Sequence, residues 1–167
     1  AGAVVGERTA RARGDRDVAT GETIGSGRKE RVVTRVGFLF NHYATHQVPH
    51  AAPYAFELSR RHPEIEVTIA ASSDAELAVA AKIGELYPGH RCTLLRLHAA
   101  WWYGPLDSLV SRFAFARKDR ILADNLEFFA GLTALVAPER HFRRLRTRHR
   151  LSKLKLIHTR HGAGDRK

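Results

Sequence analysis

The sequence predicts a doubly wound α/β domain, in which a parallel sheet of about five strands carries helices on both faces. From residue 36 onward, short apolar runs alternate with longer segments of helical period, as parallel strands joined by crossover helices require. The chain has 167 residues, and 44% of them are apolar, which is enough to build one packed core. Its apolar runs stay well below the roughly 18 residues of a membrane-spanning helix.

The first 35 residues differ in composition from the rest. They contain six glycines, no aromatic residue and charges of both signs. Such a segment buries too little apolar surface to offset the entropy of ordering. The glycines between positions 21 and 27 also lack the Lys-Ser or Lys-Thr pair and the preceding strand of a phosphate loop. We therefore predict a disordered tail at residues 1–35 and one Rossmann-like domain at residues 36–167.

The apolar runs place the strands. VGFLF at residues 36–40 is a buried strand, and similar runs predict strands at residues 66–72, 92–97, 133–138 and 153–159. The last of these, KLKLIHT, is expected to be buried as well.

The segments between the strands predict the helices. Residues 50–61 form a helix entered through Pro53 in its first turn, with Phe56 and Leu58 available to the core. Ser73 and Asp74 cap a second helix at residues 75–87. A third helical region includes residues 120–131. In such a fold, right-handed crossovers bring all the strand-to-helix loops to one edge of the sheet.

The net charge of +11 comes mostly from one segment. Residues 140–160 hold nine Lys or Arg and no acidic residue, so the remainder of the chain carries only +2. Two interpretations stay open. The segment is a solvated Arg-rich helix with Phe142 and Leu145 on its apolar side, or it binds an anion such as a phosphate, a nucleotide or acidic lipid headgroups through Arg143, Arg146 and Arg160. A nucleic-acid partner is not expected, because the charge is local and lacks interleaved base-reading groups.

The single cysteine, Cys92, cannot form an internal disulfide, which favours a cytoplasmic protein. An alternative places the protein in peripheral contact with the inner face of the plasma membrane. The chain opens on Ala1 and contains no Met, so we expect it to be part of a longer protein.

The loop after the first strand contains His42, His46 and His50 at intervals of four residues, with Gln47 among them. A helix would align three imidazoles on one face, as in a metal site. Pro49 and Pro53 argue against a continuous helix there, and no glutamate occupies the zincin position. The alternatives are a polar substrate-binding loop and a solvated or capping role, and we predict neither a metal nor a cofactor.

The loops after the third and fifth strands carry further candidates. His161 follows the last strand, and Gly162 and Gly164 can bring backbone N–H groups close to an anion. Asp165 could orient His161 or bind a hydroxyl. The alternative for this segment is a tight turn with a purely structural role. Trp102 lies in an aromatic loop that packs over the sheet edge, stacks on a sugar or base, or dips into a membrane interface.

These residues carry a resemblance. VGFLFNH and the strand leading into HTRHGAGDR, over residues 36–167, resemble the N-terminal half of a GT-B glycosyltransferase, and more narrowly the CDP-glycerol glycerophosphotransferase-like family. The resemblance implies an acceptor-side domain, a donor-binding domain following it, and His161 as the base that deprotonates the acceptor hydroxyl. It also implies that His42, His46 and Trp102 line the acceptor site. The motif here continues Ala-Gly-Asp where that family commonly has Thr-Pro.

The leading hypothesis is therefore a transferase domain that uses a nucleotide-activated donor and a hydroxyl acceptor on a cell-envelope polysaccharide or a lipid-linked sugar. The isolated chain is expected to be inactive. Two alternatives remain: a small basic module that binds nucleic acid or anionic membrane, and half of a sugar-nucleotide epimerase.

Overall fold

The computed structural model describes residues 33–41, 45–98 and 114–159, and for residues 114–117 it describes the backbone alone. The predicted tail thus lies almost wholly outside the described residues. Its predicted end at residue 35 is too late, because the first strand already begins at Thr34. In chain order, the elements are β1 (Thr34–Phe40), η1 (Thr45–Gln47), α1 (Val48–Arg61), β2 (Ile65–Ala71), α2 (Asp74–Gly84), β3 (Thr93–Arg96), α4 (Ala114–Asp124), α5 (Leu126–Ala130), β4 (Ala134–Ala137), η4 (Arg140–Arg143), α6 (Arg144–Thr147) and β5 (Lys155–His158).

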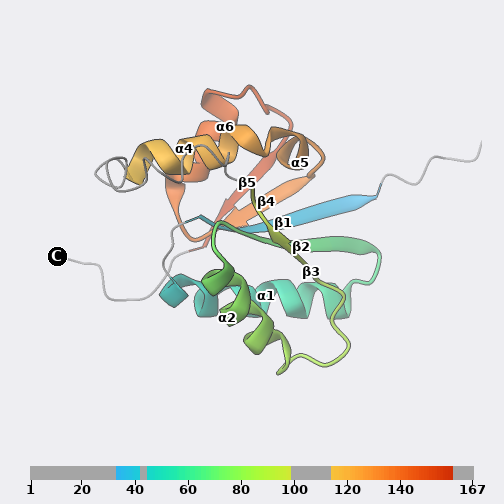
Figure 1. The fold of residues 1–167 in the computed structure, drawn as a ribbon. Helices are drawn as coiled ribbons and strands as arrows, with labels where there is room; N and C mark the ends of the chain where they lie inside the picture. Colours follow the sequence, from blue (N-terminus) through green and yellow to red (C-terminus); the bar gives the residue numbers. More distant parts are fainter. Residues whose placement is uncertain (1–32, 42–44, 99–113, 160–167) are drawn as a thin grey trace, which may run out of the picture. The chain divides into compact units, whose positions relative to one another are not determined.

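The five strands form one sheet in the order β3-β2-β1-β4-β5, and all neighbouring strands run parallel (Figure 1). Each predicted strand is present within two residues of its expected ends. This order is that of a doubly wound, Rossmann-like sheet, so the predicted fold class is confirmed. None of the described helices combines the length and the apolar character needed to cross a bilayer.

The sheet is buried between two helical layers (Figure 1). On one face, Phe38 and Phe40 of β1 pack in a core with α1 and α2. On the other face, Leu39 packs in a second core with α4, α5, η4 and α6. Gly37 allows the second layer to approach β1 closely, because an added Cβ would lie 2.6 Å from Cδ1 of Leu132.

A capping box starts α2. The Ser73 hydroxyl accepts a hydrogen bond from the backbone N–H of Glu76, and the Glu76 carboxylate accepts one from the N–H of Ser73. The predicted N-cap at Ser73 is therefore confirmed, whereas Asp74 is the first helical residue.

The predicted start of α1 is wrong. The helix begins at Val48, so Pro49 occupies its first turn and Pro53 lies inside it. Pro53 cannot donate a backbone hydrogen bond, yet a continuous helix passes through both prolines. Its buried face includes Val48 and Phe56, both fully buried, and this packing outweighs the lost bond.

The helical region predicted at residues 120–131 is present, but it is broken at Asn125 between α4 and α5. The Asn125 side chain accepts a hydrogen bond from the backbone N–H of His98 at 3.0 Å. It donates to the carbonyl oxygens of His98 at 2.9 Å and Ile121 at 2.7 Å. Asn125 is buried, so the two bonds to His98 join the end of β3 to the helical layer in a dry environment, while the bond to Ile121 lies within that layer.

The prediction that the fifth strand is buried is wrong. β5 lies at the edge of the sheet, and Lys155, Ile157 and His158 are exposed. Leu156 packs against the second core, so only one face of the strand is covered. The other edge strand, β3, is also largely accessible.

We predict that Asn125→Asp lowers the free energy of unfolding by about 2–4 kcal/mol. The substituted side chain has the same shape, but its carboxylate would face two carbonyl oxygens to which the amide now donates. Urea unfolding at pH 7 measures the change. Glu127→Gln, the reverse exchange at an exposed position on the next turn, should stay within about 0.5 kcal/mol of the wild type. An equally small effect of Asn125→Asp would contradict the conclusion that the Asn125 amide stabilises the contact between the end of β3 and the helical layer.

Candidate functional site at the carboxyl edge of the sheet

Because all five strands run parallel, the residues that follow them gather at one edge of the sheet. These residues are Asn41, Ser72, Leu97, Pro138 and Thr159. The strand order changes direction at β1, which pairs with β2 on one side and with β4 on the other. In doubly wound folds, ligands bind at the carboxyl ends of the strands beside this switch point.

A small recess of about 10 Å³ lies at the switch point. Asn41 follows β1 and lines one side of it, and Glu139 and His141 follow β4 and line the other. This volume is close to the minimum that holds one water-sized group. The recess therefore admits a single small group.

Asn41 ties this edge to α4. Its side chain is 5% exposed, and its Nδ2 donates a hydrogen bond to the carbonyl oxygen of Lys118 at 3.2 Å. Its Oδ1 is buried and has no hydrogen-bond partner among the described residues.

Lys118 lies among carboxylates from two other elements. Its Nζ is 3.3 Å from Oε2 of Glu139, and both side chains are largely shielded from solvent. Burial lowers the pKa of Lys118, and the nearby charge of Glu76 opposes this shift. The ammonium group is therefore held partly desolvated at the carboxyl edge, between groups from the ends of β2 and β4.

Glu76 is the fully buried member of this group. Its Oε2 accepts hydrogen bonds from the Ser72 hydroxyl at 3.0 Å, the Ser73 hydroxyl at 2.9 Å and the Ser73 backbone N–H at 3.0 Å. The capping-box glutamate of α2 thus also lies close enough to Lys118 to favour the charged ammonium group.

A second charge cluster centres on Asp119. Its carboxylate contacts the guanidinium groups of Arg144 and Arg148, the latter at 2.9 Å. Nε2 of His141 lies 2.8 Å from the other carboxylate oxygen. Burial lowers the pKa of His141, Asp119 opposes this, and Arg144 and Lys118 reinforce it. Two arginines of the basic segment therefore serve an internal contact.

Three neutral side-chain atoms in the described part of the chain are buried without a hydrogen-bond partner there. They are Oδ1 of Asn41, Oε1 of Gln47 and Oγ1 of Thr159. Asn41 and Thr159 directly follow β1 and β5, and Gln47 immediately precedes α1. Native proteins rarely leave such atoms unpaired, so each one calls for an explanation.

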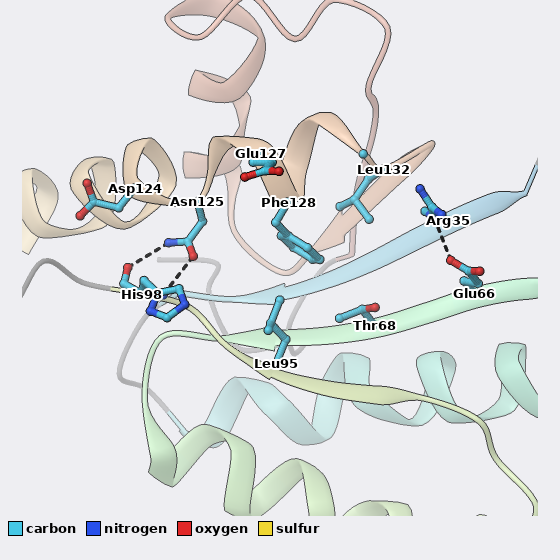
Figure 2. A pocket seen from close by; sticks show the side chains of 11 residues that line it. Arg35, Glu66, Thr68, Leu95, His98, Asp124, Asn125, Glu127, Phe128 and Leu132 are labelled. Atoms are coloured by element: carbon cyan, nitrogen blue, oxygen red, sulfur yellow. Dashed lines mark hydrogen bonds and ion pairs between the residues drawn. The ribbon is translucent and has the colours of Figure 1, made fainter.

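A groove of about 650 Å³ runs along the sheet face beside α5 and reaches the carboxyl end of β3 at His98 and Asn125 (Figure 2). Thr68 and Leu95 line it from the sheet, and Phe128 and Leu132 line it from the helical side. At one end, Arg35 and Glu66 form a largely exposed ion pair. None of the buried, unpartnered polar atoms in the described residues belongs to a residue of this groove. We therefore place the candidate site at the carboxyl edge.

The structure describes the positions of only some of the predicted site residues. Gln47 is buried, whereas His46 is exposed on η1 and Arg143 and Arg146 are exposed on η4 and α6. Phe142 and Leu145 are buried, which confirms the apolar side of the basic segment. The remaining candidates lie outside the described residues, and they are His42, Trp102, Arg160, His161, Gly162, Gly164 and Asp165. Among the residues that the structure describes, no group of three or more His, Cys, Asp or Glu is placed to hold a metal ion.

The sequence alone does not point to the charged residues of this edge. Lys118 and Asp119 reach it from α4 and contact residues 20 or more positions away, so no local pattern reveals them. For Glu76 a signal exists, because Ser73 and Glu76 have the spacing of a capping box.

Comparison of the chain with family models, curated proteins and solved structures gave no match. The fold is thus assigned from the sheet order alone, and a fold of this class serves many activities.

We predict that stability falls with decreasing pH partly through His141. Its pKa is lowered in the folded chain, so below about pH 6.5 the unfolded chain binds more protons than the folded chain. The free energy of unfolding therefore decreases as the pH falls. His141→Gln should reduce the loss of unfolding free energy between pH 7.5 and 5.5 by up to about 1 kcal/mol.

Urea unfolding at these two pH values measures the difference. Arg146→Gln, at an exposed position of the same segment, should keep the wild-type pH dependence. If His141→Gln and the wild type lose the same free energy, His141 does not contribute.

Proposed function

We propose that the chain is the acceptor-side domain of a transferase, which moves a glycosyl or glycerophosphoryl group from a nucleotide-activated donor to an acceptor hydroxyl. The acceptor would be a cell-envelope polysaccharide or a lipid-linked sugar. One observation supports the proposal most strongly. Buried polar groups, three of them with atoms that find no hydrogen-bond partner among the described residues, gather at the carboxyl ends of a doubly wound sheet, where this fold binds ligands.

The proposed chemistry is a proton transfer coupled to a displacement. His161, three residues beyond the last residue of β5, would take the proton from the acceptor hydroxyl. The oxygen would then form a bond to the anomeric carbon or the phosphorus of the donor, and the nucleotide would leave with the electron pair of the broken bond. A histidine with an ordinary pKa near 6.5 suits a general base at neutral pH. Asp165 would orient the imidazole.

The exposed arginines support a role in binding the donor phosphates. Arg143 and Arg146 project from the short helices that follow β4, whereas Arg144 contacts Asp119. Arginine binds phosphate well because its guanidinium offers several donors in one plane.

We predict that His161→Ala lowers kcat about 100-fold or more in the complete product of the gene, while substrate binding changes little. UDP-glucose, UDP-N-acetylglucosamine and CDP-glycerol serve as donors, and release of free nucleotide measures the rate. His62→Ala, an exposed histidine just before β2, is the matched control and should stay within about twofold of the wild type.

A wild-type rate in the His161→Ala variant would remove His161 from the mechanism. Absence of nucleotide release with every donor would contradict the transferase proposal. Mass analysis of the products separates transfer from epimerisation, which would convert the donor sugar without adding it to an acceptor.

A second candidate function is a basic module that binds nucleic acid or anionic membrane. It is favoured by Arg140, Arg143 and Arg146, which are exposed and form no ion pair with the described residues. The internal contacts of Arg144 and Arg148 weaken it, because they remove part of the charge from the available surface.

This candidate predicts that affinity for a 20-base-pair duplex or for phosphatidylserine vesicles falls at least tenfold between about 50 and 200 mM salt. Arg143→Gln combined with Arg146→Gln should weaken binding further. Arg60→Gln with Arg61→Gln removes the same charge from α1 and serves as the control. Fluorescence anisotropy and vesicle sedimentation measure the two partners, and no binding at 50 mM salt would eliminate this candidate.

A further inference from the structure

Two buried amide side chains at the carboxyl edge have oxygens to which no described residue donates a hydrogen bond. Asn41 is 5% exposed and Gln47 is 6% exposed, and neither Oδ1 of Asn41 nor Oε1 of Gln47 has a partner among the described residues. An unpaired buried acceptor destabilises the folded chain. Its retention points to a group that supplies the missing hydrogen bond.

The orientation of the Asn41 amide is determined by its surroundings. Its Nδ2 donates to the carbonyl oxygen of Lys118, which can only accept. Exchanging the amide nitrogen and oxygen would set two acceptors against each other. Oδ1 of Asn41 is therefore an acceptor, and whatever meets it must donate an O–H or N–H.

Among the described residues, the charges that interact around this position balance one another. Glu76, Glu139 and Asp119 supply three negative charges, and Lys118, Arg144 and Arg148 supply three positive charges. A bare anion would meet acceptor oxygens and the Glu139 carboxylate, which already pairs with Lys118. An added cation would compete with Lys118 for that carboxylate. A neutral donor fits both the acceptors and the charge balance.

The size of the recess restricts how the ligand enters. At about 10 Å³, the space lined by Asn41, Glu139 and His141 takes one hydroxyl but not a phosphate group. The rest of the ligand must remain at the edge, where Oε1 of Gln47 and Oγ1 of Thr159 are likewise buried without a hydrogen-bond partner in the described part of the chain. Several hydroxyls on one molecule would satisfy these separate positions.

We propose that the carboxyl edge binds a neutral polyol, a sugar or glycerol unit, which donates its hydroxyls to Oδ1 of Asn41 and Oε1 of Gln47. This inference rests on the proposed function, because it takes the polyol to be the group that accepts the transfer. The β1 side of the site then recognises the polyol end of the acceptor and not a phosphate.

The test uses the full chain labelled with ¹⁵N and titrated with glycerol, glucose and sucrose, and separately with inorganic phosphate and glycerol 3-phosphate. Amide shifts should be centred on residues 41, 47, 139 and 159 for at least one polyol. Inorganic phosphate should not shift residues 41 and 47. Shifts confined to the groove of Figure 2, shifts of residues 41 and 47 with phosphate alone, or no response to any polyol would overturn the inference.

Gln47→Met is the decisive variant, because it replaces the amide with an apolar side chain of similar length. It should weaken polyol binding about tenfold without lowering the thermal midpoint of unfolding, since it removes a buried acceptor that has no hydrogen-bond partner among the described residues. Thr68→Val, a polar-to-apolar change in the groove of Figure 2, is the matched control and should leave the affinity unchanged. A lower midpoint for Gln47→Met would reveal a structural partner and overturn the inference, as would unchanged affinity.

The binding test needs no donor, so its result is separable from that of the transfer assay. Polyol binding that depends on Gln47, without nucleotide release from any donor, supports this inference and contradicts the proposed function. Transfer that is insensitive to Gln47→Met supports the proposed function and contradicts this inference.

Discussion

The described structure depends on the burial of β1 between two neighbouring strands and two helical layers. β1 pairs with β2 and β4, and its alternate side chains enter opposite cores, Phe38 and Phe40 on one face and Leu39 on the other. A parallel strand of this kind requires helices on both faces. Gly37 contributes because it leaves room for Leu132. With β1 in this position, the ends of all five strands gather at one edge, and the position of the candidate site follows.

Most of the fold could be predicted from the sequence because its signals are local. Short apolar runs between turn residues locate all five strands, and Ser73 marks the start of α2. The sequence misplaces the start of α1, because Pro53 is typical of a first helical turn and the burial of Val48 is visible only in the packed structure. The exposure of β5 had a visible signal, since KLKLIH alternates lysine with leucine as an edge strand does.

The candidate site was predictable only in its location. The carboxyl edge follows from the alternation of strands and helices, but Lys118 and Glu139, and Asp119 and Arg148, meet through tertiary contacts between distant segments. The structure also divides the basic segment into parts with different roles. Arg144 and Arg148 compensate Asp119, while Arg143 and Arg146 face solvent. The net charge of the chain thus combines an internal structural contribution with an accessible one.

The edge position of β5 has a consequence for solubility. Among the described strands, β5 pairs on one side only, so the backbone N–H and C=O groups of its other side can pair with another chain, and Ile157 adds an exposed apolar side chain. Lys155 within the strand and Lys153 just before it are both exposed. Lysines on edge strands oppose pairing, because a second strand would have to desolvate their charges or bring two of them together. Lys153 and Lys155 therefore oppose aggregation through pairing of β5 with a strand of another chain.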